Sequence, residues 1–96
     1  MSAIRLLDQS RIAVSPGQVS CDLAGEVAIL NLKDSVYYGL DSVGASVWSL
    51  IQQPKTFAEI RDALLGIYEV DSAQLESDLQ VLLGELSERG LIEIQT

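Results

Sequence analysis

The chain has 96 residues, of which 48% are apolar, and this is enough for one small hydrophobic core but not for a second. Six Lys and Arg against 14 Asp and Glu give a net charge of −8, which disfavours nucleic acids and anionic membranes as partners. The sequence contains no His, the commonest general base and metal ligand, so we expect no metal site, no cofactor and no catalytic activity.

Short strands are predicted at the start of the chain. Residues 4–14 alternate loosely between apolar and polar side chains, and a turn at Ser15–Gly17 follows. Gln18–Leu23 then alternates strictly, with Val19 and Cys21 on the apolar face. This period is typical of a half-buried strand, so we expect that face to be covered.

The next two segments complete a sheet. Val27–Leu32 is a more continuous apolar run, which indicates a central strand covered on both faces. Ser35–Leu40 is rich in β-branched and aromatic residues, as strands are. The connecting turns, at Ala24–Glu26 and Lys33–Asp34, are so short that the three strands can form only an antiparallel meander.

The apolar period changes to that of helices after Leu40. A first helix is capped by Asp41 or Ser42 and stopped by Pro54. Its predicted buried residues are Val43, Val47, Trp48 and Ile51. Thr56 and Glu59 have the spacing of a capping box and open a second helix. Its predicted buried residues are Phe57, Ile60, Leu64 and Ile67, with Leu65 and Tyr68 extending that face.

The third helix is the longest. Asp71 or Ser72 caps it, and Arg89 and Gly90 end it, because glycine readily takes the positive φ of a helix C-terminus. Its apolar residues alternate in steps of three and four, and they are Leu75, Leu79, Leu82, Leu83 and Leu86. Leu91–Ile94 is a short closing strand. The predicted fold class is therefore α+β, a three-stranded antiparallel meander followed by three helices, winged helix-turn-helix-like.

The cysteine content and the hydropathy of the sequence bear on the compartment in which the protein is found. Cys21 has no partner for an intrachain disulfide, and we expect it to be a small buried hydrophobe. No apolar run approaches the roughly 20 residues that span a bilayer, and the N-terminus has no signal-peptide pattern. We therefore expect a cytoplasmic protein.

A winged-helix regulator that binds DNA as a dimer is one alternative for this outline. In such proteins the long helix carries Arg and Lys into the major groove. Here the helix has a single cation, Arg89 at its end, against acids such as Asp78 and Glu85. The charge has the wrong sign for DNA, so we expect no nucleic-acid partner.

The third strand of the meander is the main candidate for a binding site. Successive strand residues face opposite sides, so one of Tyr37 and Tyr38 faces the helices and the other faces solvent. Both can be ordinary strand aromatics. Ser35–Leu40 contains neither Pro nor charge, however, so a free edge here is able to accept an added strand from a partner peptide.

The long helix is the candidate for the other wall of that site. Its apolar band is wider than one seam requires, and most of it is core. A part of the band that the domain leaves uncovered offers surface to a partner's side chains. Asp78 is either a solvated acid or a contact for a cationic or hydroxyl group of the partner.

A family resemblance adds to this interpretation. The stretch Val27–Trp48, with the sequence VAILNLKDSVYYGLDSVGASVW, resembles the PqqD family, as do Thr56–Ile60, Tyr68–Asp71 and Gly90–Ile92. The resemblance extends from about Val14 to Ile94, and Asp41 stands where the family commonly has Asn. Members are small winged-helix-like domains called RiPP recognition elements, which bind the leader of ribosomally made precursor peptides.

The resemblance implies one peptide-recognition domain over residues 1–96 that captures a leader without catalysis. It implies that the leader adds to the third strand and lies against the third helix. The implied peptide-binding residues are Ser35, Val36, Tyr37, Tyr38, Gly39, Leu75, Asp78, Leu79 and Leu82. The Tyr-Tyr-Gly-Leu pattern is more similar to the stand-alone leader-binding proteins of lasso-peptide synthesis, which act with a leader-removing cysteine protease and a cyclase. A precursor chaperone of pyrroloquinoline quinone synthesis and an acidic subunit of a larger enzyme remain the alternatives.

Overall fold

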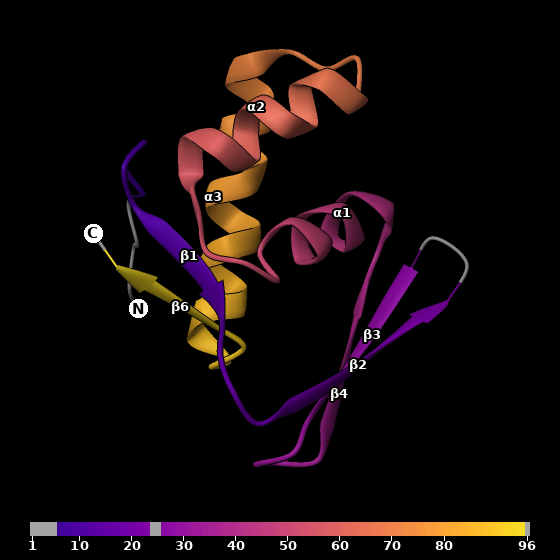
Figure 1. Cartoon of the computed structure of the whole chain (residues 1–96). Helices are drawn as coiled ribbons and strands as arrows, with labels where there is room; N and C mark the ends of the chain where they lie inside the picture. Colours follow the sequence, from indigo (N-terminus) through magenta and orange to yellow (C-terminus); the bar gives the residue numbers. More distant parts are fainter. Residues whose placement is uncertain (1–5, 24–25, 96) are drawn as a thin grey trace.

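The computed structural model describes residues 6–23 and 26–95. In this part of the chain, two three-stranded antiparallel sheets and three helices enclose the core (Figure 1). The predicted α+β class is confirmed. The turn predicted at Ala24–Glu26 includes residues 24 and 25, which lie outside the described residues.

The first sheet joins the two ends of the chain. Its strand order is β5 (Lys55–Thr56), β1 (Arg11–Val14) and β6 (Ile92–Gln95), so β1 is central. Both neighbours are antiparallel to β1, with Ile12 opposite Lys55 on one side and Ile94 on the other. The predicted N-terminal and closing strands are thus present. The two-residue strand β5 was not predicted, because it is too short to have a period.

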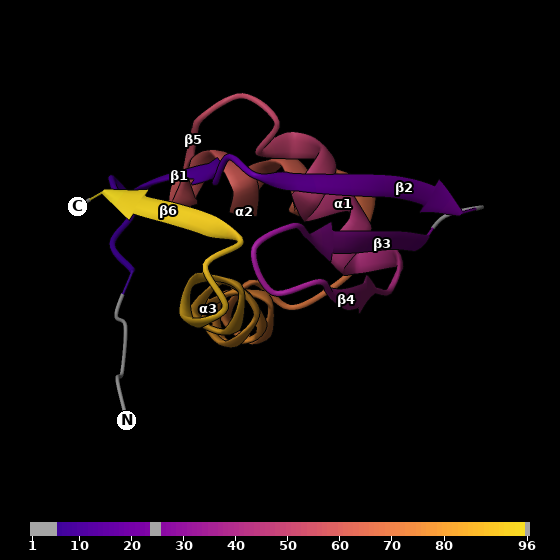
Figure 2. The same ribbon diagram turned by 90° about the horizontal axis from the view of Figure 1, so that it is seen from below.

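The second sheet is the predicted meander of β2 (Gln18–Leu23), β3 (Glu26–Asn31) and β4 (Val36–Leu40). The register places Leu30 of β3 opposite Val19 and Tyr37, and Ile29 opposite Ser20 and Tyr38. Figure 2 shows that β4 is the strand of this sheet on the side of α3, whereas β2 lies on the far side. Among the described strands, β4 pairs only with β3, so its other edge is unpaired.

Two predictions about burial in this sheet are wrong. Val19 is 55% exposed, and Cys21, predicted to be buried, is exposed as well. On the central strand, Val27 and Ile29 are buried, but the alternate residues are only half-buried. Both predictions fail for one reason, which is that the helices cover only one face of the sheet. Val19 and Cys21 lie on the other face, as do the half-buried residues of β3 that pair with them.

The helices α1 (Ser42–Leu50), α2 (Phe57–Ile67) and α3 (Ser72–Glu88) begin at predicted caps. Asp41 and Asp71 accept hydrogen bonds from backbone N–H groups of α1 and α3, and Thr56 forms the predicted capping box with Glu59. The predicted burial of Ile67 is wrong, since this side chain is 62% exposed. Ile67 is the last residue of α2, one turn beyond the point where Leu64 enters the core.

The end of α3 directs the chain back to the first sheet. Gly90 has a φ of +74°, the left-handed conformation that glycine adopts without steric cost. The N–H of Gly90 donates to the carbonyl of Ser87 at 3.0 Å, and the N–H of Leu91 donates to that of Leu86 at 2.9 Å, which is a Schellman motif. Leu91 then accepts a hydrogen bond from Ser15, and β6 follows beside β1.

The core fills the space between the helices and the two sheets. Its fully buried large side chains are Phe57, Ile12, Ile29, Ile51, Ile60, Leu64, Leu79, Leu83, Leu91 and Val47. Burying side chains of this size stabilises the fold by about 1.5–3 kcal/mol each before conformational entropy is subtracted.

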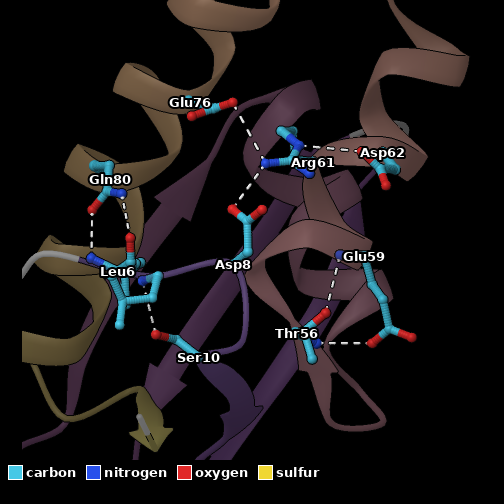
Figure 3. Close-up of polar contacts among 10 residues, drawn as sticks. Leu6, Asp8, Ser10, Thr56, Glu59, Arg61, Asp62, Glu76 and Gln80 are labelled. Carbon is cyan, nitrogen blue, oxygen red and sulfur yellow. Dashed lines mark hydrogen bonds and ion pairs between the residues drawn. The ribbon is translucent and has the colours of Figure 1, made fainter.

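Polar contacts fix the segment before β1 to the helices (Figure 3). The guanidinium of Arg61 contacts the carboxylates of Asp8, Asp62 and Glu76 at 3.0, 3.2 and 3.5 Å. The hydrogen bonds to Asp62 and Asp8 raise the pKa of Arg61. The amide of Gln80 on α3 makes two hydrogen bonds, accepting from the N–H of Leu6 at 2.9 Å and donating to its carbonyl at 3.0 Å. The N-terminal segment is therefore attached to both α2 and α3.

Candidate functional site

The unpaired edge of β4 faces the C-terminal half of α3. Tyr38 is half-buried and packs against the core, and the guanidinium carbon of Arg89 lies 4.8 Å from its ring centroid. Tyr37 is 70% exposed and lies on the opposite face of the sheet. The sequence left open which tyrosine faces the helices, and the structure assigns this position to Tyr38.

A groove of about 370 Å³, here called the strand groove, separates β4 from α3. Its β4 wall is Val36–Leu40, and its α3 wall is Leu82, Glu85, Leu86 and Arg89. Four predicted β4 residues and Leu82 thus meet at one groove. Leu40 on β4 was missed as a site residue, and so were three residues of the helix wall. These three are Glu85, Leu86 and Arg89, whose spacing from Leu82 places them on the same side of the helix.

A second depression of about 330 Å³, here called the helix pocket, adjoins the strand groove at Leu82. Its lining residues are Asp41, Val43, Gly44, Tyr68, Val70, Gln74, Leu75, Asp78, Leu79 and Leu82. All four residues predicted on the third helix are therefore in this pocket. Ser35 is the one predicted site residue that lines neither depression, because it lies in the turn before β4 with a φ of +59°.

The floor and the rim of the helix pocket differ in burial. Leu75 and Leu79 are 5% and 1% exposed, so they form the floor and belong to the core as well. Leu82 is half-buried and presents part of its side chain to both depressions. Substitutions at Leu79 therefore disturb the fold and the site together, whereas Leu82 reports on the site more directly.

The rim of the helix pocket is formed where β4 passes into α1. A Cβ atom at Gly44 would lie 3.1 Å from the Cβ of Leu40, so glycine allows α1 to start close against the strand. The N–H of Gly44 donates to Oδ1 of Asp41 at 2.9 Å, which fixes the Asp41 carboxylate at the rim. On α3, Oδ1 of Asp78 accepts a hydrogen bond of 2.9 Å from the amide of Gln74.

The charges along the site are unequal. Asp41 and Asp78 line the helix pocket, and Glu85 and Arg89 line the strand groove. The Arg89 guanidinium stacks over Tyr38 in a cation–π contact. The site as a whole thus has an excess of carboxylates, and its only lining cation among the described residues is at the C-terminal end of α3.

A third depression, of about 510 Å³, is lined mainly by residues of β2 and α1, away from the unpaired edge of β4. Ser20 and Asp22 of β2 and a row of polar α1 residues line it, together with Trp48 and Tyr68. The indole N–H of Trp48 is buried and makes no hydrogen bond within the described residues. This depression was not predicted, and we assign no function to it.

Two features are absent from the part of the chain that the structure describes. Residues 6–23 and 26–95 contain no group of three or more acids or cysteines arranged to hold a metal ion. Within the same residues, no helix has the length and the apolar character needed to cross a bilayer. The site therefore offers an unpaired strand edge, apolar surface and a few charges.

Comparison with known proteins identifies relatives of this architecture. The family model described as coenzyme PQQ synthesis protein D (PqqD) matches residues 26–92. The solved structure of TbiB1 in complex with the TbiA(beta) leader peptide superposes with a TM-score of 0.80 and 38% sequence identity. The match covers 84% of this chain and 94% of the TbiB1 chain. No protein of curated function matches the sequence significantly.

Proposed function

Because the chain belongs to the PqqD family, whose members are RiPP recognition elements, we propose that it binds the leader region of a ribosomally synthesised precursor peptide and catalyses no reaction itself. The observation that carries the proposal is the strand groove, in which an unpaired strand edge runs beside the Leu82 and Leu86 side of α3. The TbiB1 structure, 38% identical to this chain, contains a leader peptide.

The binding mode is strand addition. An extended leader segment forms backbone hydrogen bonds with β4, and these contribute affinity with little sequence preference. Alternate side chains of an added strand point to opposite faces, so every second leader residue enters the strand groove beside Leu82 and Leu86. The residues in between lie on the outer face, where Tyr37 is exposed.

The length of the site sets the length of the leader segment. From Leu75 to the C-cap residue Arg89, α3 extends for about 21 Å at 1.5 Å per residue. An extended peptide covers that distance with about six or seven residues. A leader that is disordered before binding loses several kcal/mol of conformational free energy on ordering, so its apolar side chains supply most of the affinity.

The processing step that follows is assigned from the sequence pattern. Tyr37, Tyr38, Gly39 and Leu40 stand in the motif typical of leader-binding proteins in lasso-peptide synthesis. On that basis the bound precursor is delivered to a leader-removing cysteine protease and then to a cyclase. The contribution of this protein is binding energy, which raises the local concentration of the precursor at the protease.

A specific observation favours a second candidate. The family model that matches residues 26–92 is described by coenzyme PQQ synthesis, which favours a chaperone for the precursor of pyrroloquinoline quinone. Both candidates use the same groove and differ in the peptide that occupies it. Competition between a lasso-type leader and a pyrroloquinoline-quinone-type precursor for this protein distinguishes them.

The proposal is tested by amide-shift titration of the isotope-labelled protein. The first probe is the TbiA(beta) leader peptide, and the second is the leader of a precursor peptide encoded beside this gene. We expect saturable shifts concentrated at Val36–Leu40 and Leu75–Arg89, with those of Gln18–Asp22 unchanged. No shifts with either peptide, together with a stable complex between this protein and a processing enzyme, would overturn the proposal in favour of an enzyme subunit.

Strand addition itself is tested with backbone-methylated peptides. A methyl group on a peptide nitrogen removes one hydrogen-bond donor and leaves the side chain intact. In a strand paired along one edge, only alternate N–H groups point to the partner. We therefore expect losses of affinity at every second position. Equal losses at all positions, or none, would contradict strand addition while leaving side-chain binding in the groove intact.

A further inference from the structure

The helix pocket combines an apolar floor with a charged rim. Leu75, Leu79 and Leu82 supply the floor, and the two charged residues in its lining are both acids, Asp41 and Asp78. No Lys or Arg among the described residues lines this pocket. A ligand side chain that enters it meets hydrocarbon first and two carboxylates at the edge.

Both carboxylates are oriented by a hydrogen bond from a neighbouring residue. Oδ1 of Asp41 accepts the N–H of Gly44 as the cap of α1, and Oδ1 of Asp78 accepts the amide of Gln74 one helical turn earlier. Within the described residues, Oδ2 of each carboxylate accepts no hydrogen bond, so it is open to a donor of a ligand. Because these contacts hold the carboxylates in place, a ligand donor loses less conformational freedom on binding there.

The side chains that match this pocket are those of lysine and arginine. Both have a hydrocarbon stem that packs on apolar surface and a cationic end that remains at a polar rim. Charge-assisted hydrogen bonds to carboxylates are about twice as strong as neutral ones. A wholly apolar side chain would fill the floor but would partly desolvate the two carboxylates without giving them a partner.

We propose that the helix pocket selects a Lys or Arg side chain of the bound leader, and that Asp41 and Asp78 are specificity-determining residues. This inference rests on the proposed leader-binding function and adds the chemical class of one leader residue. A strand added antiparallel to β4 starts at the Leu40 end, beside Asp41. In that orientation the cationic residue lies on the N-terminal side of the residues that occupy the strand groove.

The probe is a library of random 12-residue peptides displayed on phage and selected on the immobilised protein. We expect the enriched peptides to carry Lys or Arg at one fixed position, followed by alternating apolar residues. The best peptide is then synthesised with its cation replaced by norleucine, tyrosine or glutamate. We expect norleucine and tyrosine to weaken binding about tenfold, because the contacts with both carboxylates are lost, and glutamate to weaken it more.

Variants of the protein test the two carboxylates. Asn is as good a helix cap as Asp, so Asp41→Asn keeps α1 capped while it removes the charge. We expect Asp41→Asn and Asp78→Asn each to weaken the cationic peptide about threefold to fivefold, and to leave the norleucine peptide unchanged. Raising the salt concentration should weaken the cationic peptide alone.

A charge reversal gives the sharpest outcome. Asp78→Lys should reject the cationic peptide and favour the glutamate peptide over it. Glu93→Lys on β6 changes the net charge by the same amount outside both depressions, and it should leave the order of the peptides unchanged.

Failure of this inference is distinguishable from failure of the proposed function. Enriched peptides that compete with the TbiA(beta) leader but carry Tyr or Leu at the position facing Asp78 would overturn the cation preference and leave leader binding intact. Enriched peptides that bind outside β4 and α3, or the absence of any enrichment, would overturn both.

Discussion

The two sheets of this protein have three strands each but are held in different ways. In the first sheet, β1 has a neighbour on both sides, and the segment that precedes it is attached to α2 and α3 through Arg61 and Gln80. In the second sheet, β4 has an unpaired edge and one face open to solvent. The comparison shows that the segment leading into the first sheet is tied to two helices, while the second sheet keeps the β4 edge available for binding.

The largest expected effect is a loss of stability caused by a substitution in the first sheet. Ile12 is central in β1 and fully buried, so Ile12→Ala removes buried methyl and methylene groups and leaves a cavity. We expect the free energy of unfolding to fall by about 2–5 kcal/mol. Chemical denaturation measures the loss. The affinity of the remaining folded protein for a leader should be unchanged, and a large loss of affinity would mean that the two sheets are not separate in function.

A substitution at the strand groove is expected to lower leader affinity rather than stability. Leu82→Glu places a carboxylate at the half-buried junction of the two depressions. We expect leader affinity to fall by at least tenfold, since the apolar contact is lost and the site is already rich in acids. Val81→Glu is the matched control, because Val81 is the preceding residue, is 61% exposed and lines neither depression. Fluorescence anisotropy with a labelled leader peptide compares the two, and equal affinities would contradict the helix wall.

A smaller effect is expected where α3 holds the N-terminal segment. Gln80→Ala removes two hydrogen bonds to the backbone of Leu6. At about 0.5–1.5 kcal/mol per hydrogen bond, we expect a loss of about 1–3 kcal/mol of stability. Hydrogen exchange should show increased opening at Leu6 and Leu7 before any change in β4. Equal loss of hydrogen-exchange protection in both sheets would contradict the proposed difference between the first sheet and the second.

The smallest effect depends on pH. The backbone hydrogen bond at Thr56 lowers the pKa of Glu59 below its ordinary value of 4.5. The stability that this contact contributes is therefore fully present above pH 4.5 and decreases as the pH falls below that value. Glu59→Gln keeps a hydrogen-bonding side chain but no longer titrates. We expect the stability of this variant to depend less on pH in the acidic range than that of the unchanged protein.

The elements that the sequence predicts well are those determined by neighbouring residues. The caps at Asp41, Thr56 and Asp71 each involve a side chain and a backbone group three residues later, so their signal is local. The meander follows from two short turns, and the apolar spacing of α3 indicates its buried side. The prediction that four residues of β4 lie near Leu82 rests on the short turns of the meander, the apolar spacing of α3 and the family resemblance.

What the sequence does not predict depends on distant parts of the chain. Alternation in β2 shows that Val19 and Cys21 share a face, but not that this face lacks a cover. The choice between Tyr37 and Tyr38 depends on register, since a shift of one residue exchanges them. The contact between Arg89 and Tyr38 joins residues from opposite halves of the chain, so no local sequence pattern predicts it.

The unpaired edge of β4 also bears on how the protein behaves at high concentration. Many proteins protect such edges with Lys, Pro or a bulge, but β4 has neither Pro nor a charged residue. The net charge of −8 supplies a substitute, because two copies repel each other before their edges meet. That repulsion reaches only about 8 Å at physiological salt and weakens as the carboxylates are protonated. Solubility in the absence of a leader therefore depends on the whole surface, and it is lowest near the isoelectric point of about 4.1 or in concentrated salt solutions.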